Sequence, residues 1–177
     1  MRSRYTVREL NAAHFITCTV VEWLPLFTSA ACCDIIVNSL LYCREHKGLV
    51  IYAWVILENH FHAIVAGPEL SNTIRDLKKF TARQLIAQLA TENRDWLLET
   101  LRWHCPEYRD NCDYRVWQEG FHPKAILSDA IMQQKLEYLH NNPIERGFVA
   151  RPEHWRYSSA HEWRPESIPL LRCDPWR

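Results

Sequence analysis

The chain has 177 residues, of which 47% are hydrophobic and 24% are charged, and this composition is typical of a globular protein with one buried core. The 21 basic and 21 acidic side chains balance, so no overall positive field marks the chain as a nucleic-acid binder. The longest apolar run, residues 49–57, is far shorter than the roughly 20 residues of a membrane span, and the polar start lacks the apolar segment of a secretory signal. We therefore expect a single cytoplasmic domain with no membrane partner.

Cysteine usage points the same way. The seven cysteines are an odd number and include no Cys-x-x-Cys pair, which argues against a disulfide framework and against a cysteine zinc site. We expect reduced thiols, most of them packed inside the protein.

The first half of the chain predicts the order strand, helix, strand, strand. Segments rich in β-branched and aromatic residues predict strands, and a longer segment between a serine and a glycine predicts a helix. Ser29 is a favourable N-cap for this helix and Gly48 a favourable stop. The expected elements are a strand at 13–21, a helix at 30–47, and a hairpin with arms at 49–57 and 60–66 joined by a turn at Glu58 and Asn59.

The second half predicts two helices, a short strand and a final helix. The expected elements are a helix at about 71–90, a shorter helix ended by Pro106, a strand within 113–121 and a helix that begins near Ser128. The last helix should stop near Asn142, because Pro143 follows. We assign residues 1–150 to one domain and residues 151–177 to a C-terminal tail, packed on that domain or extending it.

This order of elements is typical of an α+β fold with a ferredoxin-like antiparallel sheet and helices packed on one face. In such an arrangement we expect the final helix to lie over the strand at 60–66.

The segment LENHFHAIV places His60 and His62 one residue apart. Side chains on a strand repeat every second residue, so both imidazoles should leave the same face and could together hold a cation. The alternative is that one imidazole is hydrogen-bonded in a core while the other faces water.

The final helix carries Tyr138 and Asn142, which are four residues apart and so project from one helical face. If this face lies over the histidine strand, a hydroxyl, an amide oxygen and two imidazoles share one pocket. The alternative is a tyrosine that packs at the rim of a core.

Two local clusters of basic residues could meet phosphate groups. One is the acid-free start of the chain, with Arg2 and Arg4, and the other is the helix that carries Lys78, Lys79 and Arg83. A charge-rich helix face can equally be only solvated.

Four ordered segments resemble the REP-associated branch of the single-tyrosine HUH transposases. They are ENHFHAIV at 58–65, WQEGFHPKAI at 117–126, YLHNNP with the following RGFV at 138–149, and PEHWRYSSAHEW at 152–163. The resemblance covers about residues 12–163. Members of this branch often have proline where this chain has Glu58, a departure that affects the turn but neither histidine.

The resemblance implies a metal-dependent endonuclease and strand transferase for single-stranded, hairpin-associated DNA. Tyr138 would form a covalent 5′-phosphotyrosine link, and His60, His62 and Asn142 would hold Mg²⁺ or Mn²⁺. The protein would act as a monomer or a homodimer. Two alternatives stay open: a DNA-binding protein without turnover, and a metal-dependent nuclease that uses water, with Tyr138 only structural.

Overall fold

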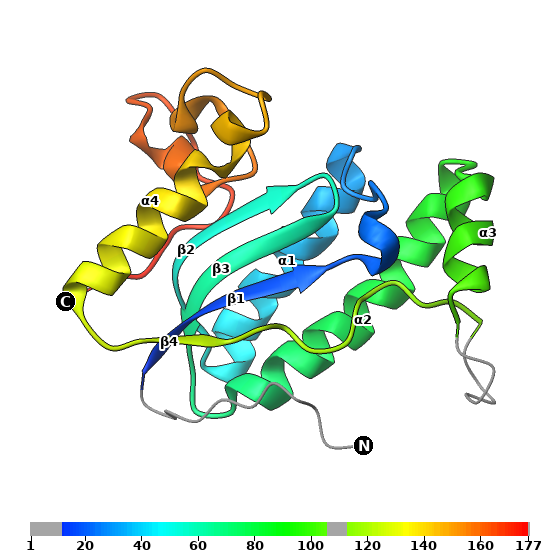
Figure 1. Ribbon diagram of the computed structural model, residues 1–177, viewed down its shortest axis with the longest axis horizontal. Coiled ribbons are helices and arrows are strands. Elements are labelled where there is room, and N and C mark those ends of the chain that lie inside the picture. Colours follow the sequence, from blue (N-terminus) through cyan, green and yellow to red (C-terminus); the bar gives the residue numbers. More distant parts are fainter. Residues whose placement is uncertain (1–11, 106–112, 177) are drawn as a thin grey trace.

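The chain folds around one four-stranded antiparallel sheet. A computed structural model describes residues 12–105 and 113–176 (Figure 1). Its elements are β1 (Ala13–Thr19), α1 (Ala30–Lys47), β2 (Val50–Leu57), β3 (His60–Ala66), α2 (Leu70–Thr91), α3 (Asp95–Trp103), β4 (Lys124–Ile126) and α4 (Asp129–Glu145), with short 3-10 helices at Val21–Trp23, Pro152–His154 and Ser159–Trp163. The sheet order β2-β3-β1-β4 confirms the predicted α+β class and ferredoxin-like arrangement.

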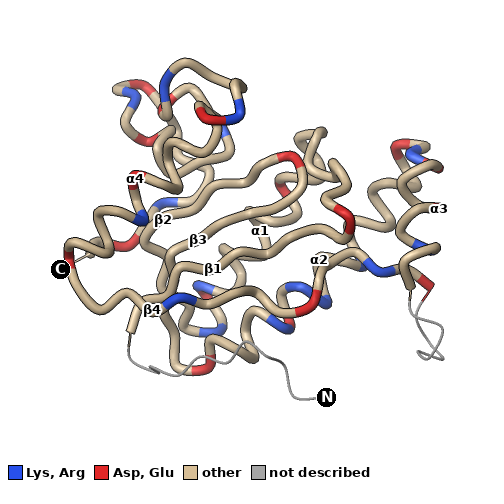
Figure 2. Tube along the Cα trace, in the orientation of Figure 1, with Lys and Arg blue, Asp and Glu red and all other residues tan. Residues whose placement is uncertain are grey.

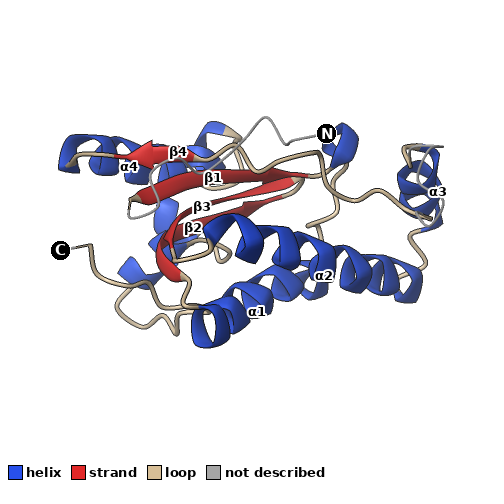
Figure 3. Cartoon of the chain, turned by 90° about the horizontal axis from the view of Figure 1, so that it is seen from below, coloured by secondary structure: helices blue, strands red, loops and turns tan. Residues whose placement is uncertain are grey.

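The helices lie on both faces of this sheet. Helices α1 and α2 cover one face and α4 lies over the other (Figure 3). The prediction that the helices share one face is therefore wrong for α4, whereas the prediction that the final helix lies over the histidine strand is confirmed. No helix in the described ranges is long and apolar enough to cross a membrane.

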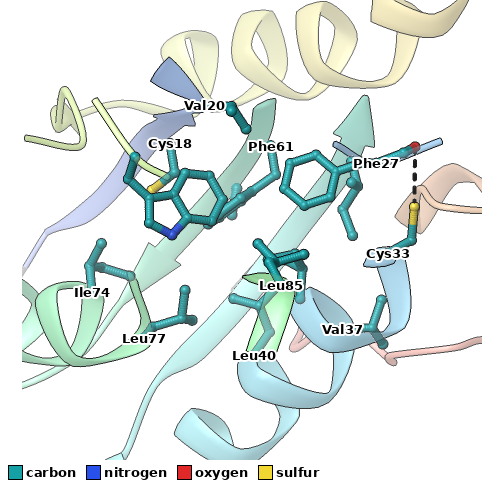
Figure 4. Packing of buried hydrophobic residues seen from close by; sticks show 14 of the residues in the cluster. Cys18, Val20, Phe27, Cys33, Val37, Leu40, Phe61, Ile74, Leu77 and Leu85 are labelled. Atoms are coloured by element: carbon teal, nitrogen blue, oxygen red, sulfur yellow. Dashed lines mark hydrogen bonds between the residues drawn. The ribbon is translucent and has the colours of Figure 1, made fainter. Parts of the chain in front are cut away.

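Strand β3 sends alternate side chains into the two layers. Phe61, Ala63 and Val65 are buried in the large core between the sheet and the helices α1 and α2. Figure 4 shows part of this core, with Phe61 among side chains of α1 and α2 such as Leu40 and Leu85. The intervening residues of β3 consequently face α4.

Three of the four predicted helix ends are confirmed. The Ser29 hydroxyl accepts a hydrogen bond from the Cys32 amide, Gly48 adopts a left-handed conformation with φ of 64°, and Ser128 caps α4. The predicted stop at Asn142 is wrong, because α4 continues to Glu145 with Pro143 inside it. A proline this close to the helix end disturbs only the final turn.

The predicted strand at 113–121 is also wrong. In this segment Trp117 makes a single bridge to Val20, and the fourth strand forms only at Lys124–Ile126. Gly120 with φ of 76° and His122 with φ of 47° lie between the two and interrupt extended pairing. Trp117 packs instead into the α1/α2 core.

The C-terminal tail packs along β2. The Ile56 amide donates to the Tyr157 carbonyl at 2.8 Å, and the Trp54 indole donates to the Leu171 carbonyl at 3.1 Å. Leu171 is buried in the α1/α2 core. The tail therefore contributes to the same core as the sheet, and the division at residue 150 stays a prediction.

The cysteines largely follow the expectation of reduced thiols. Five are free: Cys18, Cys32, Cys33 and Cys43 are buried, and Cys173 is partly buried. Cys105 is disulfide-bonded, so the expectation is wrong for this residue. The seventh, Cys112, lies outside the described residues.

Candidate active site

The two imidazoles of β3 converge on one point. The Nε2 atoms of His60 and His62 lie 3.1 Å apart, and both side chains are buried. The other ring nitrogen of each histidine is occupied, since His60 Nδ1 lies 2.6 Å from the Asn59 Oδ1 atom and His62 Nδ1 lies 2.9 Å from the Thr17 hydroxyl. An amide oxygen only accepts hydrogen bonds, so His60 Nδ1 carries the proton and His60 Nε2 presents a lone pair.

Both imidazoles are neutral at physiological pH. Burial lowers the pKa of His60 to about 4, with a smaller contribution from the positive charge of Arg146. Burial lowers the pKa of His62 to about 3, and the neighbouring His60, Arg146 and Lys135 act in the same direction. Because metals bind the neutral ring, this environment favours metal ligation over protonation.

The pair fits a divalent cation. Two ligand atoms each about 2.1 Å from a metal, at roughly a right angle, are about 3 Å apart, which matches the separation of the two Nε2 atoms. Among the described residues no group of three His, Cys, Asp or Glu side chains could complete the ligand set. Within the described ranges, a third protein ligand of another type, such as an amide, is compatible with the pair.

Helix α4 places a tyrosine ring beside the pair. The Tyr138 ring lies 5.7 Å from the His62 ring, and Phe15 contacts both rings at 5.8 Å and 5.0 Å. The Lys135 ammonium lies 5.7 Å from the centre of the Tyr138 ring. Tyr138 itself is 44% exposed, so a large ligand can reach a side chain whose neighbours are mostly buried.

Asn142 lies one helical turn beyond Tyr138 and is only 6% exposed. Its Nδ2 atom donates to the Tyr138 carbonyl at 3.4 Å, a bond that does not involve the amide oxygen. One turn further, Arg146 lowers the pKa of both His60 and His62 through its charge. Asn142 is therefore on a helical row between two residues that both approach the histidine pair.

The predicted basic residues do not gather at this point. Helix α2, which carries Lys78, Lys79 and Arg83, lies on the opposite layer of the sheet (Figures 2 and 3). Lys79 and Arg83 are exposed, whereas the Lys78 ammonium donates to the Gln118 carbonyl at 2.7 Å and to the Gly120 carbonyl. Arg2 and Arg4 lie outside the described residues.

Four residues near the pair were missed from the sequence: Thr17, Asn59, Lys135 and Arg146. The register of β1 and β3, which pairs Thr17 with His62, was not readable without the sheet order. A signal did exist for Arg146, because it continues the four-residue spacing of Tyr138 and Asn142.

The chain has the fold of a REP-associated tyrosine transposase. The solved structure of such a transposase bound to a REP hairpin matches it with a TM-score of 0.67 at 18% identity, covering 99% of this chain and 93% of that one. A putative REP-associated tyrosine transposase of Haemophilus influenzae is 27% identical over 117 residues, which is 66% of this chain. The REP-associated tyrosine transposase of Escherichia coli is 22% identical over 129 residues, which is 70% of this chain.

The match to these curated relatives spans 62% of the length of each. No family model matches the chain. The resemblance to REP-associated tyrosine transposases that the four sequence segments indicated is confirmed.

Proposed function

We propose that this protein is a metal-dependent endonuclease and strand transferase for single-stranded, hairpin-associated DNA, acting through a covalent 5′-phosphotyrosine intermediate. The observation that carries the proposal is the half-exposed Tyr138 ring 5.7 Å from an imidazole whose Nε2 atom converges with that of His60. The likeness to the transposases supports it. DNA as the partner, the cytoplasm as the place of action and a monomeric or homodimeric state belong to the same proposal.

The chemistry assigned to Tyr138 is nucleophilic attack. Its phenolic oxygen bonds to the phosphorus of a DNA phosphodiester while the bond from phosphorus to the 3′ oxygen breaks. The phenolic proton leaves to the surroundings and the departing 3′ oxygen takes up a proton. The products are a DNA 5′ end linked to Tyr138 and a free 3′ hydroxyl, which can attack the link in reverse, so no nucleotide cofactor is needed.

The neighbouring side chains hold this arrangement. Asn59 and Thr17 bind the outer nitrogens of His60 and His62 and so orient the two rings. Mg²⁺ or Mn²⁺ held by His60, His62 and the Asn142 amide would supply positive charge that offsets the charge developing on the phosphate. An amide oxygen suits both ions, and Mn²⁺ tolerates imidazole nitrogen better.

The shape of the site favours a flexible strand over an intact duplex. Tyr138 approaches the histidine pair beside Phe15 and under the charge of Lys135, so the DNA backbone must bend into a partly buried site. Of the remaining predicted DNA contacts, Arg2, Arg4, Lys79 and Arg83 would bind flanking phosphates. For Lys78 we propose an indirect role, because its ammonium already holds the Gln118–Gly120 segment.

A denaturing gel tests the proposal. With labelled hairpin DNA bearing a single-stranded foot and Mg²⁺ or Mn²⁺, the wild-type protein should give a shifted, protease-sensitive band joined to the 5′ end of the downstream fragment. Tyr138→Phe removes one oxygen and keeps the ring, so it should bind DNA but give neither adduct nor nick. Tyr42→Phe is the matched control, because Tyr42 is similarly exposed at 56% but lies on α1.

The same gel distinguishes the alternatives. Binding without cleavage by the wild-type protein would indicate a DNA-binding protein, and cleavage without adduct would indicate a nuclease that uses water. His60→Ala and His62→Ala should each abolish cleavage. Metal-dependent cleavage by the double variant would overturn the assignment of the histidine pair.

A further inference from the structure

An ion pair joins the end of α4 to the turn between β2 and β3. The Arg146 Nη1 atom donates to the Glu58 Oε1 atom, and Arg146 is the C-cap residue of α4. Glu58 immediately precedes Asn59 and His60, so the pair lies at the edge of the candidate active site.

Arg146 is positioned to act on the site electrostatically. It continues the helical row of Tyr138 and Asn142 at four-residue spacing. Its ion-pair partner Glu58 lies two residues before His60 in the turn that leads into β3, which places the guanidinium beside the histidine strand. A cation on the same side of α4 as Tyr138 could contact a phosphate of the DNA strand that Tyr138 attacks.

Neither partner of the ion pair is saturated. A guanidinium has five N–H donors, and in the described part of the chain the Arg146 side chain has Glu58 as its partner. The Glu58 Oε2 atom is buried and has no hydrogen-bond partner among the described residues. A buried carboxylate oxygen without a partner costs free energy, so this pairing leaves Glu58 incompletely satisfied.

We propose that Arg146 binds a backbone phosphate of the DNA strand at the Tyr138 site, and that Glu58 is a competing anion that holds the guanidinium while DNA is absent. This inference rests on the proposed function, because it requires DNA at that site. A phosphate presents oxygens in the fork geometry that a guanidinium matches, so it can displace a single carboxylate oxygen. Arg146 is then a substrate-positioning residue next to the nucleophile.

A purely structural ion pair makes a different prediction. If the pair only fastens α4 to the β2–β3 turn, removing either charge should loosen the same contact and change DNA binding in the same direction. If Glu58 competes with phosphate, removing its charge frees the guanidinium and should strengthen binding, whereas removing Arg146 should weaken it. The signs of the two effects therefore separate the two roles.

The experiment measures binding of fluorescent hairpin DNA with a single-stranded foot by anisotropy, in a Tyr138→Phe background that prevents cleavage. Arg146→Gln should raise the dissociation constant about tenfold and lower the slope of log affinity against log salt by about one. Glu58→Gln should lower the dissociation constant several-fold. Arg146→Lys, which keeps the charge but loses the fork, should fall between Arg146→Gln and Arg146.

A matched control comes from a second ion pair of similar exposure. Arg44 and Asp174 are 30% and 26% exposed, against 32% and 24% for Arg146 and Glu58, but they join α1 to the tail. Arg44→Gln and Asp174→Asn should leave DNA binding unchanged. Thermal melting of every variant shows whether it is folded before binding is compared.

Replacing single phosphates of the foot by uncharged methylphosphonates locates the contact. At one position the substitution should weaken binding by the Arg146 protein and have little further effect on Arg146→Gln. Equal binding by folded Arg146→Gln and Arg146 proteins would overturn the inference alone, as would weaker binding by Glu58→Gln. Failure of the Tyr138→Phe protein to bind hairpin DNA at all would overturn the proposed function, and the inference with it.

Discussion

The two faces of the sheet differ in what they bury, although β3 contributes alternate residues to both. On the side of α1 and α2, Phe61, Ala63 and Val65 enter a large apolar core. On the side of α4, His60 and His62 lie beside a smaller apolar cluster. Because side chains alternate along a strand, the seven residues of β3 contribute to the apolar core on one face and to the candidate active site on the other.

The smaller apolar cluster holds α4 against the sheet. Met132 and Leu139 of α4 pack against β2 residues such as Ala53 and Val55, and this contact sets the height of α4 above the sheet. Tyr138 precedes Leu139 and is 44% exposed, so the buried leucine anchors the turn that carries the exposed tyrosine. The main role of packing in the α4 layer is therefore to position the half-exposed side chain of Tyr138.

The largest expected effect comes from the apolar face of β3. Phe61→Ala removes a fully buried ring from the α1/α2 core and should lower the free energy of unfolding by about 3–5 kcal/mol. Urea unfolding measures this loss. The yield of adduct per folded molecule should stay near that of the wild-type protein, because Phe61 points away from Tyr138.

His62→Ala should show the reverse pattern, with a smaller loss of stability and no adduct. If Phe61→Ala abolished the adduct in molecules that melt cooperatively, the separation of the two faces would be wrong.

An effect that is smaller for each residue should appear on the α4 side as the pH falls. His60 and His62 have pKa values of about 4 and about 3 in the folded protein, below the ordinary value of 6.5. Below pH 6.5 the unfolded chain binds protons that the folded site excludes, so the free energy of unfolding should decrease until the folded pKa is reached. The loss should be about 2–3 kcal/mol for each imidazole between pH 6.5 and 4, measured by urea unfolding across that range.

His140 provides the control, because burial also lowers its pKa to about 4 but its ring bonds to Ser159. His140→Gln and the His60→Gln, His62→Gln double variant should both flatten the pH dependence. At pH 7, Mn²⁺ should stabilise the wild-type and His140→Gln proteins and not the double variant. Equal stabilisation of all three by Mn²⁺ would remove the histidine pair as the metal site.

Periodicity accounts for most of what was predictable. The alternation in 60–66 placed His60 and His62 on one face, and the four-residue spacing placed Tyr138 and Asn142 on one side of α4, because both arguments use only local geometry. The side of the sheet on which α4 packs was not predictable in this way, since it depends on how a distant helix meets the sheet.

The wrong predictions came from local sequence rules that the surrounding structure overrides. Pro143 was expected to end the final helix, but a proline in the last turn is tolerated. The segment 113–121 has the residue types of a strand, yet Trp117 packs in the core, and the left-handed residues Gly120 and His122 interrupt extended pairing before Lys124. Lys78 was grouped with Lys79 and Arg83 by sequence, although its neighbours in space are the carbonyls of 118–120.

The smallest expected effect concerns the outer surface of α2, on the layer opposite the histidine pair. Lys79 and Arg83 are exposed and free to meet phosphates of a flanking DNA segment that passes this layer. Lys79→Gln with Arg83→Gln should weaken hairpin binding several-fold and lower the slope of log affinity against log salt by up to about one for each lost contact. Anisotropy titrations at several salt concentrations measure both quantities.

Lys78→Met tests whether neighbouring bases of α2 differ in role. Its ammonium donates to the Gln118 and Gly120 carbonyls, so its loss should lower the free energy of unfolding by about 1–3 kcal/mol and leave the salt slope unchanged. A reduced slope for Lys78→Met would mean that DNA, rather than the 118–120 segment, is the main partner of this lysine. An unchanged slope for the Lys79, Arg83 double variant would mean that DNA does not reach α2, which would confine the substrate to the α4 side of the sheet where Tyr138 lies.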